Sequence, residues 1–120
     1  MVLKAAAPGL LGDPLLYRAA PAPASPLRPV AGPQFRRTER VSIEWPLLTP
    51  IDHREARLLG RDGNPVPIDV TVTERTSAGA PVLAADLNLA PLTAGDYVIE
   101  VTVRAGERVE RRMAALRVMR

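Results

Sequence analysis

The sequence predicts an all-β domain, built as an antiparallel β-sandwich of about seven strands with a proline-rich N-terminal extension. Three observations lead to this prediction. Apolar and polar residues alternate along several short stretches, as they do where one face of a strand is buried. Glycines and prolines typical of turns separate these stretches. The chain also contains 13 prolines, which argues against long helices.

Composition limits the architectures and functions open to this chain. A length of 120 residues suits one domain with a hydrophobic core. Aromatic residues make up only 3%, so we expect a core of Val, Leu, Ile and Ala. Cysteine is absent, which excludes disulfides, thiol catalysis and thiolate metal sites. No apolar run reaches the length of about 18 residues that a membrane-spanning helix needs.

Proline and glycine positions divide the chain into three predicted segments. Residues 1–12 are small, apolar and interrupted early by proline and glycine, so we expect a flexible tail. Residues 13–34 are expected to form a short edge strand and then an extended segment, because its prolines exclude a central strand. Residues 35–120 are expected to form the β-sandwich.

The first strong strand is predicted over residues 35–45. Val41, Ile43 and Trp45 share one of its faces. Trp45 is the single tryptophan, and we expect it to anchor the core. In the alternative interpretation, Trp45 or Tyr17 is exposed and forms a platform for a carbohydrate or peptide ligand.

The middle and the end of the chain predict a hairpin, a loop and a bulge. The Asp-Gly turn at residues 61–65 joins two alternating stretches, so residues 58–72 are expected to form a hairpin. A loop is expected over residues 75–81, before a strand over residues 82–89. In the last strand, residues 108–118, the apolar positions change parity, which predicts a bulge near residues 113–115.

The clearest pattern is a turn at residues 92–95 that leads into a strand. Gly95 ends the turn, and Tyr97, Ile99, Val101 and Val103 point to one face of the strand. With the other strands, this pattern gives a predicted core. It consists of Val41, Ile43, Trp45, Leu58, Val70, Val72, Leu87, Tyr97, Ile99, Val101, Val103 and Val118.

No set of residues in the sequence predicts catalysis, a cofactor or a metal site. His53 is the single histidine, and it lacks a second His or any Cys to complete a zinc site. Asp62, Asn64 and Asp69 are fewer oxygen ligands than the six to eight or so that calcium needs. No glycine-rich phosphate loop is present. We therefore expect the protein not to be an enzyme.

The formal net charge of +3 raises the question of a nucleic-acid partner. We expect none, because the 16 basic residues are interleaved with 13 acidic ones and stacking aromatics are scarce. Two arginine clusters remain as candidate binding sites for an acidic protein partner. They are Arg36, Arg37 and Arg40, and Arg111 with Arg112. If their strands are neighbours, the clusters form one basic patch; otherwise they are solvated strand faces and charged sheet edges.

The segment from Leu92 to Val101 resembles the tyrosine corner of immunoglobulin-like and fibronectin type III-like sandwiches. Tyr97 occupies the position of the corner tyrosine, with Leu92 and Gly95 in the preceding turn. In that motif the hydroxyl group bonds to the backbone a few residues upstream. The resemblance implies a structural role for Tyr97. The cysteines of antibody domains are absent, so the chain is not an antibody-type domain.

A second resemblance covers residues 12–118. The segments that carry it are residues 12–18, 35–41, 56–63 and 89–97. They are similar to the C-terminal region of certain bacterial exported proteins that have a von Willebrand factor type A-related domain upstream. The metal-binding Asp-x-Ser-x-Ser signature of the type A domain is missing here. The resemblance implies a C-terminal accessory sandwich outside the cytoplasm, periplasmic or secreted, without catalytic residues.

These observations predict a non-catalytic interaction or spacer module of a larger exported protein. The expected partner is a protein, either another domain of the same chain or a separate molecule. The alternative is a carbohydrate- or peptide-binding sandwich that uses an exposed aromatic side chain. The sequence leaves the oligomeric state open.

Overall fold

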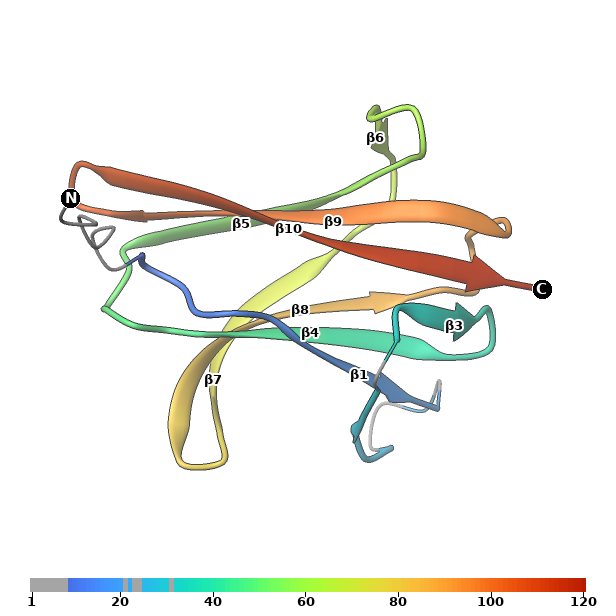
Figure 1. The fold of residues 1–120 in the computed structure, drawn as a ribbon, viewed down its shortest axis with the longest axis horizontal. Coiled ribbons are helices and arrows are strands. Elements are labelled where there is room, and N and C mark those ends of the chain that lie inside the picture. Colours follow the sequence, from blue (N-terminus) through green and yellow to red (C-terminus); the bar gives the residue numbers. More distant parts are fainter. Residues whose placement is uncertain (1–8, 21, 23–24, 31) are drawn as a thin grey trace, which may run out of the picture.

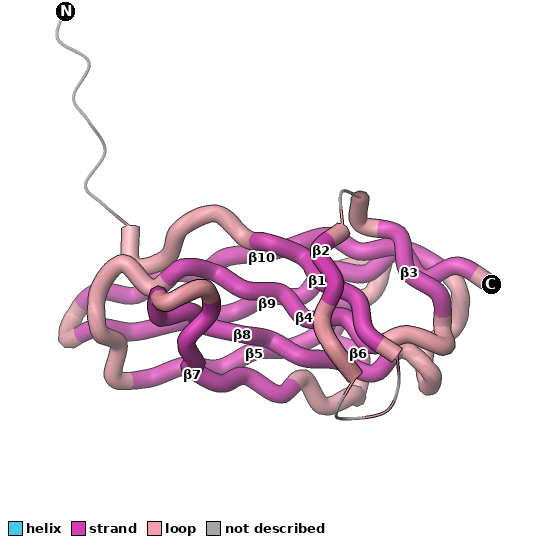
Figure 2. The backbone as a smooth tube through the Cα atoms, turned by 90° about the horizontal axis from the view of Figure 1, so that it is seen from below, coloured by secondary structure: helices cyan, strands magenta, loops and turns pink. Residues whose placement is uncertain are grey.

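A computed structural model of the chain describes residues 9–20, 22, 25–30 and 32–120. In these residues the structure is all-β, with ten strands in two five-stranded sheets (Figures 1 and 2). Sheet one contains, in spatial order, β2 (Arg28–Pro29), β1 (Leu15–Ala19), β4 (Arg40–Pro46), β8 (Ala80–Asn88) and β7 (Thr71–Ser77). Sheet two contains β3 (Gln34–Arg36), β10 (Arg108–Met119), β9 (Gly95–Ala105), β5 (His53–Leu59) and β6 (Pro65–Val66). No helix in the described residues could span a membrane.

The order of the strands confirms the predicted immunoglobulin-like sandwich. The order β1-β4-β8-β7 corresponds to strands A, B, E and D of that fold, and β10-β9-β5 corresponds to strands G, F and C. The two sheets lie one above the other in Figure 1. All strand pairs are antiparallel except β3 with β10, which is parallel.

The core lies between the two sheets and follows the predicted alternation. Val41, Ile43 and Trp45 of β4 are fully buried, so the interpretation of Trp45 as a core residue is confirmed. Ile99, Val101 and Val103 of β9, Leu58 of β5, and Leu87 and Val118 are also buried. Val70, Val72 and Tyr97 are only half-buried and pack against the edge of the core. The core also includes Leu10, Leu11 and Phe35, which the prediction omitted.

The predicted strand over residues 35–45 is two strands in different sheets. β3 pairs with β10 in sheet two, whereas β4 pairs with β1 and β8 in sheet one. The turn between them is closed by Glu39, whose backbone N–H donates to the Arg36 carbonyl at 3.0 Å. The Glu39 carboxylate in turn accepts from the Arg36 N–H at 2.7 Å. These local bonds let the chain cross from one sheet to the other.

The predicted hairpin over residues 58–72 is correct only at its start. Leu58 and Leu59 pair with Val66 and Pro65, but β7 then pairs with β8 in sheet one. Prolines 65 and 67 lack the N–H that a longer ladder requires, which ends the pairing. Val70 and Val72 therefore lie at the rim of the sandwich.

The loop expected over residues 75–81 is instead a tight β-hairpin turn between β7 and β8. The two strands pair as far as Ser77 with Ala80. The two turn residues, Ala78 and Gly79, have φ angles of 51° and 80°. Positive φ at both positions is typical of a type I′ turn, whose twist matches the flanking strands.

The predicted bulge in β10 is absent. β9 and β10 pair without interruption from Arg108 with Ala105 to Val118 with Gly95. Val109 and Met113 point away from the core and are 56% and 59% exposed. The inward positions at this end of β10 are occupied by Glu110 and Arg112, and this polar pair explains the apparent change of parity.

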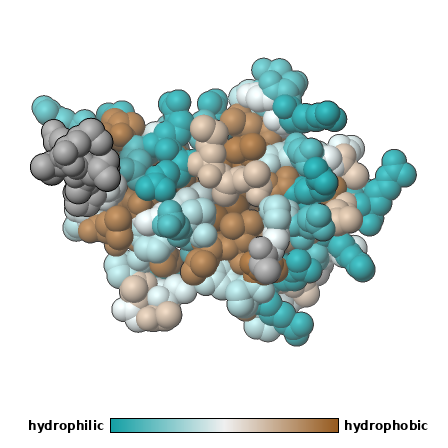
Figure 3. All heavy atoms as spheres, in the orientation of Figure 1, coloured by the Kyte–Doolittle hydropathy of each residue, from teal (hydrophilic) through white to brown (hydrophobic). Residues whose placement is uncertain are grey.

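Residues 9–12, here called the N-terminal strap, bond to β10 and to the end of β4. Leu10 and Leu11 are buried in the core, and their N–H groups each donate to the Glu110 carboxylate at 3.0 Å. Arg112 donates to the Leu11 carbonyl at 2.7 Å, and the Gly12 N–H donates to the Pro46 carbonyl. Figure 3 is drawn in the orientation of Figure 1, and it shows apolar residues gathered over the middle of the face that is turned toward the viewer.

The strap corrects the predicted domain boundaries. Residues 1–8 of the expected flexible tail lie outside the described residues, but Leu10 and Leu11 belong to the core. The expected edge strand, β1, has neighbours on both sides, because β2 pairs with Tyr17 and Arg18. Among the described residues, the sandwich therefore includes residues that precede residue 35 as well as residues 35–120.

Tyr97 forms the hydrogen bond that the tyrosine-corner resemblance predicts. Its hydroxyl group donates to the Thr93 carbonyl at 2.8 Å, across the turn that leads into β9. Gly95, between them, has a φ of 154°, which residues with a side chain rarely adopt. The turn and the start of β9 are thus held together.

Replacement of Tyr97 by Phe tests the contribution of this hydrogen bond to stability. We expect Tyr97→Phe to lower the free energy of unfolding by about 0.5–1.5 kcal/mol in urea denaturation. Tyr17→Phe is the matched control, because the Tyr17 hydroxyl has no hydrogen-bond partner among the described residues. Equal unfolding midpoints for Tyr97→Phe and the unmodified protein would contradict the structural role of Tyr97.

Glu110 makes the attachment of the strap dependent on pH. Burial raises the pKa of Glu110, but hydrogen bonds from Leu10 and Leu11 and the Arg112 guanidinium outweigh it, so the pKa lies below its ordinary value. A depressed pKa means that the ionised carboxylate stabilises the folded state at neutral pH. This contribution is lost as the pH falls from about 4.3, the ordinary glutamate pKa, through the folded-state pKa.

Glu110→Gln should lower the free energy of unfolding by roughly 1–3 kcal/mol near neutral pH. The difference from the unmodified protein should shrink on acidification below the ordinary glutamate pKa. Urea unfolding as a function of pH measures both effects. Glu107→Gln in the exposed β9–β10 turn is the control, because it removes the same charge without touching the strap. A difference that stays constant with pH would contradict the assignment.

Candidate functional site

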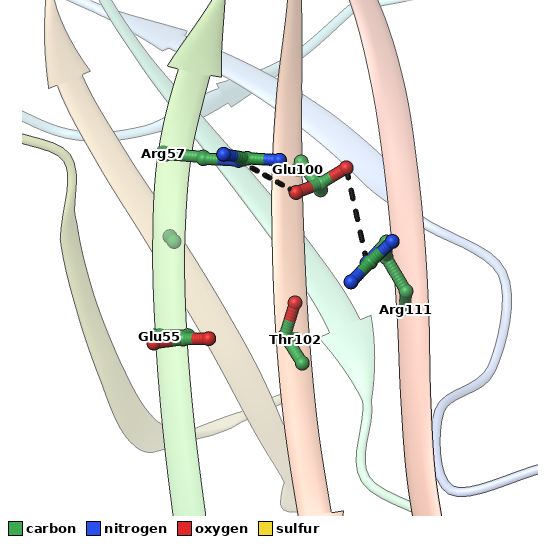
Figure 4. A pocket seen from close by; sticks show the side chains of 6 residues that line it. Glu55, Arg57, Glu100, Thr102 and Arg111 are labelled. Carbon is green, nitrogen blue, oxygen red and sulfur yellow. Dashed lines mark hydrogen bonds and ion pairs between the residues drawn. The ribbon is translucent and has the colours of Figure 1, made fainter. Parts of the chain in front are cut away.

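The outer face of sheet two carries a group of charged residues from three adjacent strands (Figure 4). Arg57 of β5 lies opposite Glu100 of β9, and Thr102 of β9 lies opposite Arg111 of β10. Residues that alternate along a strand share a face, so these side chains all point away from the core. We call Arg57, Glu100 and Arg111 the Glu100 cluster.

Glu100 is the centre of this cluster. Its side chain is only 8% exposed and lies between the two arginines (Figure 4). Arg57 Nε donates to Glu100 Oε1 at 2.7 Å, and Arg111 Nε lies 3.9 Å from Oε2. The surface here forms a hollow of about 290 Å³, which Glu55, Ala56 and Thr102 also line. Both carboxylate oxygens face a guanidinium, so the geometry links three strands by charge.

A second charged group lies on the outer face of sheet one. Arg75 of β7 reaches across β8 to Glu44 of β4, with an N–O distance of 3.1 Å. It also donates to the Ser42 hydroxyl at 2.7 Å and approaches Asp86 at 3.3 Å. Ser42 and Glu44 are buried. The buried carboxylates of the described residues, Glu44 and Glu100, are thus each paired with arginine.

The five arginines predicted to bind a partner do not form one patch. Arg111 points outward from β10 toward Glu100, whereas Arg112 points inward and pairs with Glu110 at 3.1 Å. Arg40 lies in the other sheet and donates to backbone carbonyls of Ala20 and Ala22. The condition for a single patch is not met, because β3 pairs only with the last residues of β10, Arg117–Met119, and β4 lies in the other sheet.

Arg36 and Arg37 instead lie beside Arg120. The three arginines line a hollow of about 740 Å³ together with Thr38, Thr93 and Ala94, which we call the basic hollow. This grouping has no signature in the sequence, because it depends on the parallel pairing of Arg36 with Met119. The alternation of apolar residues carries no signal for that pairing.

His53, Asp62 and Asn64, the other polar candidates in the sequence, do not come together in one site. The side chain of His53 is 55% exposed on β5, and Nε2 lies 3.8 Å from Glu55. The Asn64 N–H and side chain donate to Asp62, which lowers the pKa of Asp62 below its ordinary value. These bonds assign Asp62 and Asn64 to the turn. Within the described ranges, no three His, Cys, Asp or Glu residues form a group that could hold a metal ion.

The aromatic platform proposed as an alternative is wrong for Trp45, which is 0% exposed. Tyr17 is half-buried on β1, opposite Ser42. A platform that stacks on a sugar needs an open aromatic face. A ligand role for Tyr17 stays an untested prediction.

No protein-family model, curated protein or solved structure matches this chain. The resemblance to exported proteins with a type A-related domain therefore stays a prediction. The tyrosine corner rests on the contacts of Tyr97 within this structure.

The fluorescence of Trp45 tests its placement directly. We expect blue-shifted emission that iodide quenches weakly, because the indole ring is fully buried and its N–H has no hydrogen-bond partner in the described residues. Unfolding in urea should shift the emission to the red and make the fluorescence more readily quenched by iodide. A red-shifted spectrum of the folded protein, or a response to added glycans, would contradict the burial of Trp45.

Proposed function

We propose that this chain is a non-catalytic interaction module, or a spacer with a binding face, within a larger exported bacterial protein. The outer face of sheet two is the proposed binding face for a protein partner. The resemblance of residues 12–118 to the C-terminal region of exported proteins supports the extracytoplasmic and accessory parts of the proposal. The observation that carries the binding face is the exposure of apolar residues beside the Glu100 cluster.

Apolar exposure on this face is concentrated on β10. Met113 is 59% exposed and lies directly opposite Glu100 in the β9–β10 ladder. Val109, four residues earlier on the same strand face, is 56% exposed. Methionine and arginine are both enriched in protein interfaces relative to the remaining surface. Met113, Val109 and Arg111 together give a partner both apolar area and a charge to pair with.

The ion pairs of the Glu100 cluster favour binding over catalysis. General acid–base chemistry needs a carboxyl group that can reach a proton on the substrate. Glu100 faces Arg57 and Arg111 with its two oxygens, and Glu44 on the other sheet is paired with Arg75. Paired charges on a rigid sheet instead fix the pattern of potential that a partner meets.

Site-specific photo-crosslinking tests the binding face. A photoreactive phenylalanine analogue at Met113, in the full-length protein in its native cells, should form adducts with a protein partner. Leu15 is the matched control, because it is 58% exposed and lies on the outer face of sheet one. We expect adducts from position 113 and few from position 15. Equal adducts from both positions, or none from position 113, would contradict the proposed face.

A further inference from the structure

Two sets of arginines in this protein differ in whether a carboxylate lies close to the guanidinium. One group has a carboxylate within 4.0 Å of the guanidinium, and it consists of Arg18, Arg54, Arg57, Arg75, Arg111, Arg112 and Arg117. Arg36, Arg37 and Arg120, which line the basic hollow, have no such carboxylate in the part of the chain that the structure describes. Three positive charges without internal counter-charges thus surround one hollow.

The fold holds two of these arginines in place. Arg37 Nη2 donates to the Ala90 carbonyl at 2.8 Å, which fixes the guanidinium against the loop before β9. Arg36 lies on β3, beside Met119 of β10. Because its guanidinium is already held, Arg37 loses less side-chain entropy when it binds a ligand.

The acidic residue closest in sequence to Arg36 and Arg37 does not pair with their guanidinium groups. Glu39 lies three residues after Arg36, but one of its oxygens accepts the Arg36 backbone N–H at 2.7 Å. The other lies 3.5 Å from the Arg18 guanidinium. Asp96, near the neighbouring Thr93–Ala94 turn, pairs with Arg117 at 2.7 Å. Both carboxylates are used by other groups, so the charge of the hollow is available to a ligand.

We propose that the basic hollow binds an acidic segment of a protein, one in which several Asp or Glu residues lie close together. Guanidinium groups bind carboxylates through paired N–H donors, and arginine is favoured where such recognition is needed. A volume of about 740 Å³ accommodates several side chains rather than a single ion. Thr38 and Thr93, both exposed residues, also line the hollow, and the hydroxyl group of Thr93 lies 3.2 Å from that of Tyr97.

The lining of the hollow favours a peptide over a nucleic acid. Proteins that bind single-stranded nucleic acid combine positive charge with aromatic side chains on which bases stack. None of the residues that line the basic hollow is aromatic. The hollow shares no lining residue with the Glu100 cluster, so this inference does not depend on the proposed binding face.

Binding of a fluorescein-labelled hexaglutamate peptide, followed by fluorescence anisotropy, tests the proposal. We expect Arg36→Gln and Arg37→Gln each to weaken binding roughly two- to fivefold, the range for exposed charge pairs. The double variant should weaken it further. Arg104→Gln is the matched control, because Arg104 is exposed, lies near the other end of β9 and has no carboxylate partner among the described residues. Affinity for a hexaserine peptide should be undetectable.

Four outcomes of the binding experiment would overturn the proposal. They are no binding of hexaglutamate even at low salt, an equal loss in Arg104→Gln, no loss in either hollow variant, and stronger binding of oligothymidylate of the same charge. Amide NMR shifts of the unmodified protein give a second measurement that needs no variant. Hexaglutamate should shift Thr38, Thr93 and Ala94 and leave Thr102 unchanged. Larger shifts at Thr102 would place the peptide elsewhere and contradict the proposal.

Discussion

The structure depends on the burial of one face of each sheet against the other. β4 and β9 are inner strands of their sheets, and their alternate residues from Val41 to Trp45 and from Ile99 to Val103 are fully buried. With 3% aromatic residues, the chain fills this space mainly with branched aliphatic side chains, and Trp45 and Phe35 supply the largest volumes. Because interiors are close-packed, this arrangement fixes which residues of every strand must face outward.

Outward positions on the inner strands are still poorly exposed, and the protein occupies them with ion pairs. Glu44 and Glu100 each lie on an inner strand and each pair with an arginine from another strand of the same sheet. Such a pair contributes little net stability, but removal of one partner leaves an uncompensated charge. The pairs therefore favour one register of the strands. In the basic hollow, by contrast, Arg36, Arg37 and Arg120 have no carboxylate partner among the described residues, so their charges can pair with those of a ligand.

The sequence predicted the parts of the fold that local patterns encode. The alternation of apolar residues predicted the inward faces of β4 and β9, and a short motif predicted that the Tyr97 hydroxyl bonds to the backbone a few residues upstream, which proves to be the Thr93 carbonyl. The errors arise where distant residues decide the outcome. Glu110 and Arg112 occupy inward positions because the strap, about 100 residues earlier, bonds to them. The sequence pattern of β10 alone does not reveal this contact with the strap, so two inward polar residues were interpreted as a bulge. The basic hollow likewise depends on a parallel pairing between β3 and the end of β10.

The strap also bears on how the domain assembles. β9 and β10 are joined by a short turn, so their long ladder needs only local chain closure. The bonds between Leu10 and Glu110 join residues 100 positions apart, and closing a loop of that length costs more conformational entropy. They also require that β4 and β10 already stand on either side of the gap that Leu10 and Leu11 fill. Contacts at such a sequence separation are expected to form late in folding, so the amides of Leu10 and Leu11 should gain protection from hydrogen exchange only when the strands around them are in place.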